Sequence, residues 1–220
     1  MSVEMIHLRK LLQLFYLPPN RQTTKLREDI RNDRDRESGG SGSGPDFFGG
    51  FWADAKGHVF GRGDLHESVR GRVESNPGRQ RLYPALRDGF LRWWNERRRW
   101  TNEPFQPAEV PHARYVIERL GTVKVENVLA VKDAAGADHF VYPYFCEEPE
   151  LRDEAARLGL WLLQAALPRL DPAELRILDV IRGPTFSVDR NPLQGDEEQI
   201  FLRRYTSLHR RWLELKEEYP

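Results

Sequence analysis

The sequence predicts an α+β protein, with a helical N-terminal half followed by a mixed sheet that is packed with helices. Three observations lead to this fold class. Before residue 100, apolar residues recur at intervals of three or four, which is typical of amphipathic helices. From Arg114 onwards, runs rich in Val, Ile, Tyr and Phe are typical of strands. The stretch 150–167 between two such runs is helical in pattern, so we expect a hairpin–helix–strand unit.

Residues 1–38 are expected to form a charged helical arm. A short amphipathic helix should end before Pro18-Pro19, because proline cannot continue a helix. The segment 25–37, KLREDIRNDRDRE, alternates in charge and has only Leu26 and Ile30 as apolar anchors, which favours a solvated helix. Residues 39–45, GGSGSGP, are rich in Gly and Ser and predict a flexible linker. Residues 46–220 then form a single α+β body, and the arm packs on this body or on a partner.

Two helices are expected between the linker and the sheet. Asp64, with Glu67 three residues later, has the spacing of a helix N-cap with a capping box, and SNPG (75–78) ends this helix. A second helix should run from Leu82 to about Trp100. Its apolar face is marked by Leu82, Leu86, Phe90, Trp93 and Trp94.

The second half predicts the sheet. The β-rich segments 114–133 and 138–145 are separated by AAGA, a turn in which Gly136 can adopt a positive φ. The helix over 150–167 is apolar on nearly every side and should be buried. The segment 175–183, LRILDVIRG, predicts a strand that is buried on both faces. Asp196 and Gln199 are expected to cap a long final helix.

Composition excludes several classes of function. The chain has 34 basic and 34 acidic residues, so global charge does not favour nucleic-acid binding and any such binding needs a local patch. Cys146 is the single cysteine, which favours a reducing, cytoplasmic location. The sequence contains no apolar run of about 18 residues, so we expect no membrane span. The six histidines lack the spacing of a zinc site, and we expect no metal or other cofactor.

The stretch GPDFFGGFWADAKGHV (44–59) spells the outline of a metal-dependent nuclease site. Two carboxylates that bind Mg²⁺, together with a nearby lysine, are the groups that phosphodiester cleavage requires. Asp46, Asp54 and Lys56 supply these groups if residues 51–60 form a strand, because side chains two positions apart then share a face. Only seven residues separate Asp46 from Asp54 and glycines surround them, so a loop or a helical turn is the competing interpretation.

Two further groups of residues are candidates for binding. RWWNERRRW contains Arg92, Arg97, Arg98 and Arg99, which we interpret as a phosphate-contacting set, although the tryptophans beside them are also expected in a core. Next to the linker, four aromatic residues are candidates for contact with a protein partner, either directly or by anchoring the loop. These residues are Phe47, Phe48, Phe51 and Trp52.

The order of a helix (residues 83–100), a hairpin, a helix and a strand resembles the core of the restriction-endonuclease-like fold of the RecB kind, over roughly residues 82–188. In that family, an acid and an acid-x-lysine motif lie on the hairpin strands. Glu126 matches the first acid, but Tyr142-Pro143-Tyr144 occupies the place of the acid-x-lysine motif. The resemblance therefore implies a degenerate, catalytically inactive core. If the resemblance fails, Pro143 marks an edge strand that cannot pair further.

The sequence thus favours a non-catalytic binding subunit or adaptor of a larger bacterial cytoplasmic assembly. It would act through contacts with a protein partner, and nucleic acid is the second candidate partner. The alternative is a Mg²⁺-dependent nuclease that uses Asp46, Asp54 and Lys56.

Overall fold

The computed structural model describes residues 2–38 and 47–218. Asp46 and the Gly/Ser segment expected to be a linker lie outside the described residues. Within these ranges the chain forms seven α-helices and eight strands, which confirms the α+β class. The helices are α1 (Leu8–Tyr16), α2 (Pro19–Glu37), α3 (Gly49–Val59), α4 (Leu65–Ser75), α5 (Tyr83–Arg92), α6 (Asp153–Ala166) and α7 (Glu197–Glu217).

The strands form two mixed sheets. The smaller sheet has the order β1-β4-β3 and the larger has the order β2-β5-β6-β7-β8. In each sheet one pair is parallel, β1 with β4 and β6 with β7. The strands are β1 (Met5–His7), β2 (Gln106–Pro107), β3 (Ala113–Ile117), β4 (Gly121–Val125), β5 (Leu129–Lys132), β6 (Asp138–Tyr144), β7 (Leu175–Asp179) and β8 (Thr185–Phe186).

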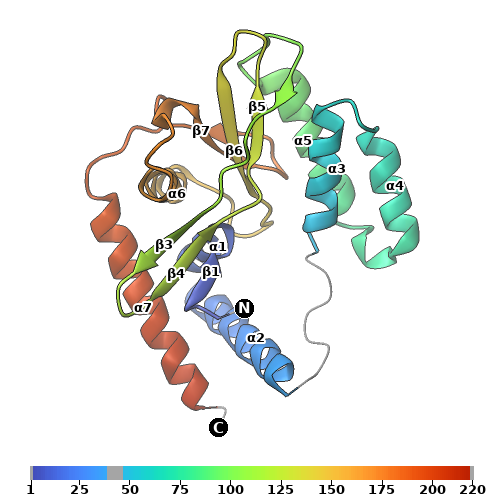
Figure 1. Ribbon diagram of the computed structural model, residues 1–220. Coiled ribbons are helices and arrows are strands. Elements are labelled where there is room, and N and C mark those ends of the chain that lie inside the picture. Colours follow the sequence, from blue (N-terminus) through green and yellow to red (C-terminus); the bar gives the residue numbers. More distant parts are fainter. Residues whose placement is uncertain (1, 39–46, 219–220) are drawn as a thin grey trace.

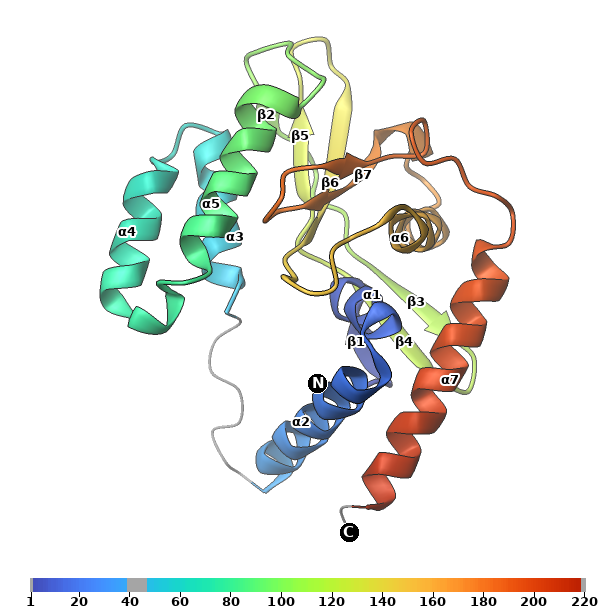
Figure 2. The same cartoon turned by 180° about the vertical axis from the view of Figure 1, so that it is seen from behind.

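The larger sheet separates two hydrophobic clusters. Helices α3, α4 and α5 group on one side of it, while α1, α2, α6, α7 and the smaller sheet lie on the other (Figures 1 and 2). Alternate residues of β6 serve the two sides, as the period of two requires. Tyr142 and Tyr144 join the cluster with α1 and α6, whereas Val141 joins the cluster with α3 and α5.

The hairpin–helix–strand unit forms as predicted. Gly136 has a φ of 85° in the turn between β5 and β6. Helix α6 connects β6 to the parallel strand β7, and both elements are largely buried. Strand β6 lies in the centre of the sheet, between β5 and β7, so the alternative of an edge strand is wrong. Pro143 pairs in register with Leu178 inside this sheet.

Of the two helix caps that the sequence predicted at Asp64 and Asp196, the first forms and the second does not. The Asp64 side chain accepts a hydrogen bond from the Glu67 backbone N–H at 2.9 Å, as expected for a cap. Helix α7 begins beside Asp196, but the Asp196 side chain makes no cap hydrogen bond. Instead, the buried Glu197 carboxylate accepts from the backbone N–H groups of Gln194 and Gly195. That carboxylate therefore fixes the turn that leads into α7.

The N-terminal segment is built into the core. Strand β1 pairs with β4, and the Tyr205 hydroxyl donates to the Val3 carbonyl at 2.7 Å. The segment contributes fully buried side chains to the cluster around α6 and α7, namely Val3, Ile6, Leu8, Leu11, Leu12, Leu14, Phe15, Leu26 and Ile30. The sequence allowed the arm to pack either on the body or on a partner, and in the structure it packs on the body.

Candidate nucleic-acid interface

The candidate phosphate-contacting arginines lie at the end of α5 and in the segment that follows it. A π-helical turn (Trp93–Arg97) follows α5, and the backbone becomes extended at Arg98. Trp93, Trp94 and Trp100 are buried in the cluster beneath α3–α5. The tryptophans are therefore core residues, and in the described chain this segment presents arginines rather than indole rings to solvent.

Arg98 is a structural residue. Its guanidinium carbon lies 4.0 Å from the Trp94 ring centroid and 4.4 Å from the Phe105 ring centroid. Its Nη2 pairs with the Glu103 carboxylate at 3.0 Å. Cation–π contacts and the carboxylate hold this side chain against the body, and its exposed fraction is only 12%, although its Nη1 has no hydrogen-bond partner among the described residues. Arg98 must therefore be removed from the phosphate-contacting set.

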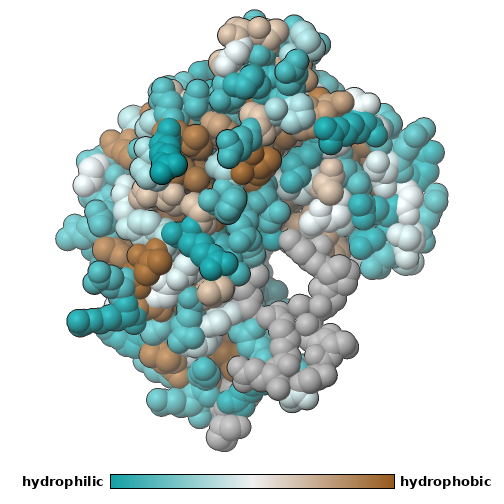
Figure 3. Space-filling model, in the orientation of Figure 1, coloured by the Kyte–Doolittle hydropathy of each residue, from teal (hydrophilic) through white to brown (hydrophobic). Residues whose placement is uncertain are grey.

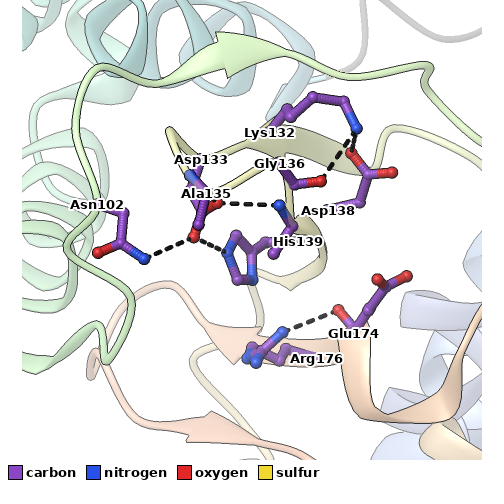
Figure 4. Close-up of polar contacts among 10 residues, drawn as sticks. Asn102, Lys132, Asp133, Ala135, Gly136, Asp138, His139, Glu174 and Arg176 are labelled. Atoms are coloured by element: carbon purple, nitrogen blue, oxygen red, sulfur yellow. Dashed lines mark hydrogen bonds and ion pairs between the residues drawn. The ribbon is translucent and has the colours of Figure 1, made fainter.

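A buried polar network fixes the segment to the β5–β6 hairpin (Figure 4). One oxygen of Asp133 accepts from the Ala135 and Ala137 backbone N–H groups, each at 3.0 Å. The other accepts from Asn102 at 3.2 Å and lies 3.3 Å from Nε2 of His139. Burial opposes ionisation of Asp133, but these four hydrogen bonds outweigh it and hold the pKa of that carboxyl below its usual range.

His139 connects this network to Trp100. The two rings stack with centroids 4.3 Å apart and 7° between their planes. Burial lowers the pKa of His139, and the hydrogen bond to Asp133 opposes that shift. The ring is neutral at pH 7 on this account, with Nε2–H donating to Asp133. Because Trp100 and Asn102 are both held, Arg97 and Arg99 project from a fixed backbone.

Arg92, Arg97 and Arg99 are exposed, as a binding role requires. Nη1 of Arg97 donates to the Arg182 carbonyl at 3.3 Å. Nη1 of Arg99 lies 3.0 Å from the Asp189 carboxylate, on the loop between β8 and α7. The three side chains therefore remain candidates for phosphate contact.

Sequence reasoning missed Arg176 and Arg190. Arg176 lies on β7, where its Nη1 donates to the Glu174 carbonyl at 2.9 Å. Burial lowers the pKa of Arg176; the charges of Asp189 and Glu174 raise it, and those of Arg99 and Arg190 lower it further. These charges come from the segment after the π-helical turn, from the turn before β7 and from the β8–α7 loop. No short-range sequence pattern predicts that residues so far apart in the chain lie together. The one available signal was the presence of an arginine in a segment that is predicted to be a buried strand.

The aromatic residues next to the linker separate into two groups. Phe51 and Trp52 are buried, and Nε1 of Trp52 donates to the Asn127 carbonyl at 2.5 Å. These two residues are core residues, so their expected direct contact with a partner is wrong. Phe48 is half-buried and stacks on Phe145 with centroids 4.9 Å apart. Phe47 is exposed and remains a candidate.

The proposed nuclease constellation does not have the expected local geometry. Asp54 and Lys56 lie on helix α3, not on a strand. Two residues apart on a helix, their side chains are separated by about 200° and cannot share one face. The Asp54 carboxylate forms a bidentate ion pair with Arg72, with Nη2 to Oδ1 at 2.9 Å and a second, shorter contact from Nε. The strand interpretation is therefore wrong.

The positions that the RecB resemblance selected are occupied by ordered tyrosines. The Tyr142 hydroxyl accepts from the Arg9 backbone N–H at 3.0 Å. The Tyr144 hydroxyl donates to the Pro149 carbonyl at 2.6 Å. One carboxylate oxygen of Glu126 lies 3.8 Å from Nδ1 of His7.

No known protein family, curated protein or solved structure matches this chain. Within residues 2–38 and 47–218, no three His, Cys, Asp or Glu side chains gather in a way that could hold a metal ion. None of the helices described is both long and apolar enough to cross a membrane.

Proposed function

We propose that this chain is a non-catalytic binding subunit or adaptor of a bacterial cytoplasmic assembly, and that it contacts nucleic acid through an arginine surface. This surface consists of Arg92, Arg97, Arg99, Arg176 and Arg190. The observation that carries the proposal is that Arg99 pairs with Asp189 at 3.0 Å, while the charges of Asp189, Arg99 and Arg190 all act on the half-buried Arg176. A surplus of guanidinium groups matches the forked geometry with which arginine binds phosphates.

The rigidity of the surface supports a binding role. Asp133 and His139 hold the backbone just after Arg99 through Asn102 and Trp100, so less side-chain and loop ordering is required when a ligand binds. The tryptophans of the same segment are buried, and contact would therefore be made mainly with the phosphate backbone. Binding of this kind depends strongly on salt and weakly on nucleotide sequence.

A groove between the N-terminal helices and the α3–α5 group supports the protein-binding part of the proposal. It encloses about 670 Å³, and its apolar surface comes from Leu17, Phe48, Leu82 and Phe145. Ion pairs of Lys10 with Asp29 and of Arg81 with Glu147 surround that surface. An apolar centre within a charged rim is the usual anatomy of a protein interface. On the face seen in Figure 3, apolar surface occurs only as small separate patches.

The degenerate nuclease-like core remains part of the proposal. Its support is the order α5, β5–β6 hairpin, α6 and parallel β7, together with hydroxyl groups at Tyr142 and Tyr144 that bond to backbone groups. Neither tyrosine provides the carboxylate and lysine that metal-dependent cleavage needs.

Fluorescence anisotropy with labelled duplex and single-stranded DNA and RNA tests the nucleic-acid proposal. We expect binding that weakens as salt concentration rises. Arg99→Ala, Arg176→Ala and Arg190→Ala should each weaken binding similarly for all sequences and reduce the salt slope by about 1. Arg203→Ala and Arg210→Ala provide a matched control, because these exposed arginines lie on α7.

Two results would contradict the proposal. One is the absence of binding at low salt, and the other is an equal loss of affinity in the α7 control variants. The same samples, incubated with Mg²⁺ or Mn²⁺, test the nuclease alternative. Metal-dependent cleavage that disappears in Asp54→Ala would establish a nuclease and refute the non-catalytic reading.

A further inference from the structure

Lys56 has an environment that the proposed function does not explain. It lies in the last turn of α3, next to the buried residue Ala55, and is itself half-buried. No carboxylate in the described part of the chain pairs with it. Burial lowers the pKa of the Lys56 ammonium group, and no neighbouring charge offsets that effect. Partial burial of a lysine without a carboxylate partner is unfavourable, because the ammonium loses part of its hydration.

The Lys56 side chain lines a cleft between α3 and the β2–β5 edge of the larger sheet. The cleft encloses about 410 Å³, which is within the range of small-molecule sites, roughly 300–1,000 Å³. Strand β2 pairs with β5 at Lys132 and Val131, and the Ala108 backbone N–H extends this pairing to the Ala130 carbonyl at 3.2 Å, so the cleft lies at the end of the paired segment. Its accessible apolar wall comes from Phe60, Ala108 and Val110, and the buried residues Leu129 and Ala130 lie behind them.

A second cation lies at the same cleft. Helix α3 ends with Gly61 at a φ of 66°, and the Arg62 backbone N–H donates to the Gly57 carbonyl at 2.9 Å. This turn folds the chain back, so Arg62 also lines the cleft. Its guanidinium carbon lies 5.6 Å from the Phe60 ring centroid. None of the residues that line the cleft is acidic.

We propose that this cleft is a binding site for a small carboxylate with an apolar body. Lys56 and Arg62 bind the carboxylate, and the wall formed by Phe60, Ala108 and Val110 covers the apolar part. The ammonium supplies a point charge and the guanidinium a pair of parallel donors, which suits the two oxygens of one carboxylate. The attraction of Lys56 to the C-terminal end of α3 accounts for its position along the helix, but not for the apolar cleft beside it.

The size and charge of the site select this ligand class over others. A cationic or neutral amphiphile would leave the ammonium of Lys56 desolvated and without a partner. A charged ligand without an apolar body would leave the wall of the cleft uncovered. The site does not use the arginine surface, so it stands or fails independently of nucleic-acid binding.

Isothermal titration calorimetry of the full-length protein with decanoate tests the proposal. We expect saturable binding of one decanoate, whereas decylamine should not bind. Lys56→Met keeps the apolar stem and removes the charge, and it should weaken binding at least about tenfold, because a charge-assisted contact is lost. Lys56→Arg should retain most of the affinity. Lys124→Met removes the same charge from β4 and should change nothing.

A second variant tests the cleft without changing a charge. A β-carbon added at Gly57 would meet only the Arg62 side chain, at 3.9 Å, so Gly57→Leu can fold and should fill the cleft. It should abolish decanoate binding while leaving the thermal midpoint near that of the wild type. Binding that persists in both Lys56→Met and Gly57→Leu would overturn the proposal. So would decylamine binding as tight as decanoate, a complete absence of decanoate binding, or binding only of a peptide with an apolar C-terminus.

Discussion

Gly89 and Gly71 provide a matched pair of substitutions with opposite expected signs. Both glycines lie inside helices, Gly89 in α5 and Gly71 in α4. A β-carbon at Gly89 would lie inside the van der Waals radii of the Val180 and Ile181 carbonyl groups, in the turn after β7. A β-carbon at Gly71 meets no atom within 4 Å. We predict that Gly89→Ala destabilises the protein and that Gly71→Ala stabilises it.

The magnitude follows from two opposing terms. Replacement of glycine by alanine in a helix interior stabilises it by about 0.5–1 kcal/mol, and this term alone applies to Gly71→Ala. At Gly89, displacement of packed backbone costs about 3 kcal/mol or more, at the upper end of the overpacking range. The carbonyl groups cannot rotate away as a side chain would, because the Arg182 backbone N–H and side chain both donate to buried Asp179. The net loss for Gly89→Ala is therefore about 2 kcal/mol or more.

Urea denaturation followed by circular dichroism measures both variants. With a slope of about 2 kcal/mol/M, the midpoint of Gly89→Ala should fall by about 1 M, whereas that of Gly71→Ala should rise by about 0.3–0.5 M. The slopes should match that of the wild type. If Gly89→Ala is as stable as the wild type, then α5 does not contact the 180–183 turn closely, and the packing argument is refuted.

Two further predictions concern the N-terminal segment and His139. Deletion of residues 1–38 should abolish the cooperative thermal transition, because β1, α1 and α2 belong to the core. The composition of this segment instead predicted a separate arm, and a cooperative transition that survives the deletion would support that prediction. Leu12→Ala alone should cost about 2–5 kcal/mol in the same assay. For His139, the folded-state pKa is lowered by burial, next to Asp133, Asp138 and Arg176. The unfolded chain therefore binds the proton first, and stability is lost as pH falls below about 6.5. The stability advantage of the wild type over His139→Gln should shrink between pH 8 and pH 5; an advantage independent of pH would contradict this.

Local chemistry was sufficient to predict most of the elements. The Asp64 cap, the Gly136 turn and the hairpin–helix–strand unit all depend on residues close together in the chain, and each appears in the structure. Segment 51–60 was ambiguous, because short apolar and glycine-containing stretches fit a strand or a helix equally well. The structure places it in α3, and the opposite faces of Asp54 and Lys56 follow from that.

The sequence by itself determined the α+β class, the Asp64 cap and the Gly136 turn, because period and turn chemistry act over a few residues. Only the tertiary structure decided which arginines lie together. Arg98 packs against the rings of Trp94 and Phe105, while the charge of Arg176 interacts with that of Arg99, which lies 77 positions earlier in the chain. Contacts between distant segments depend on how whole elements pack, and a spacing pattern carries no information about that. For the same reason the charged N-terminal helices, which resemble a detachable arm in composition, became part of the core.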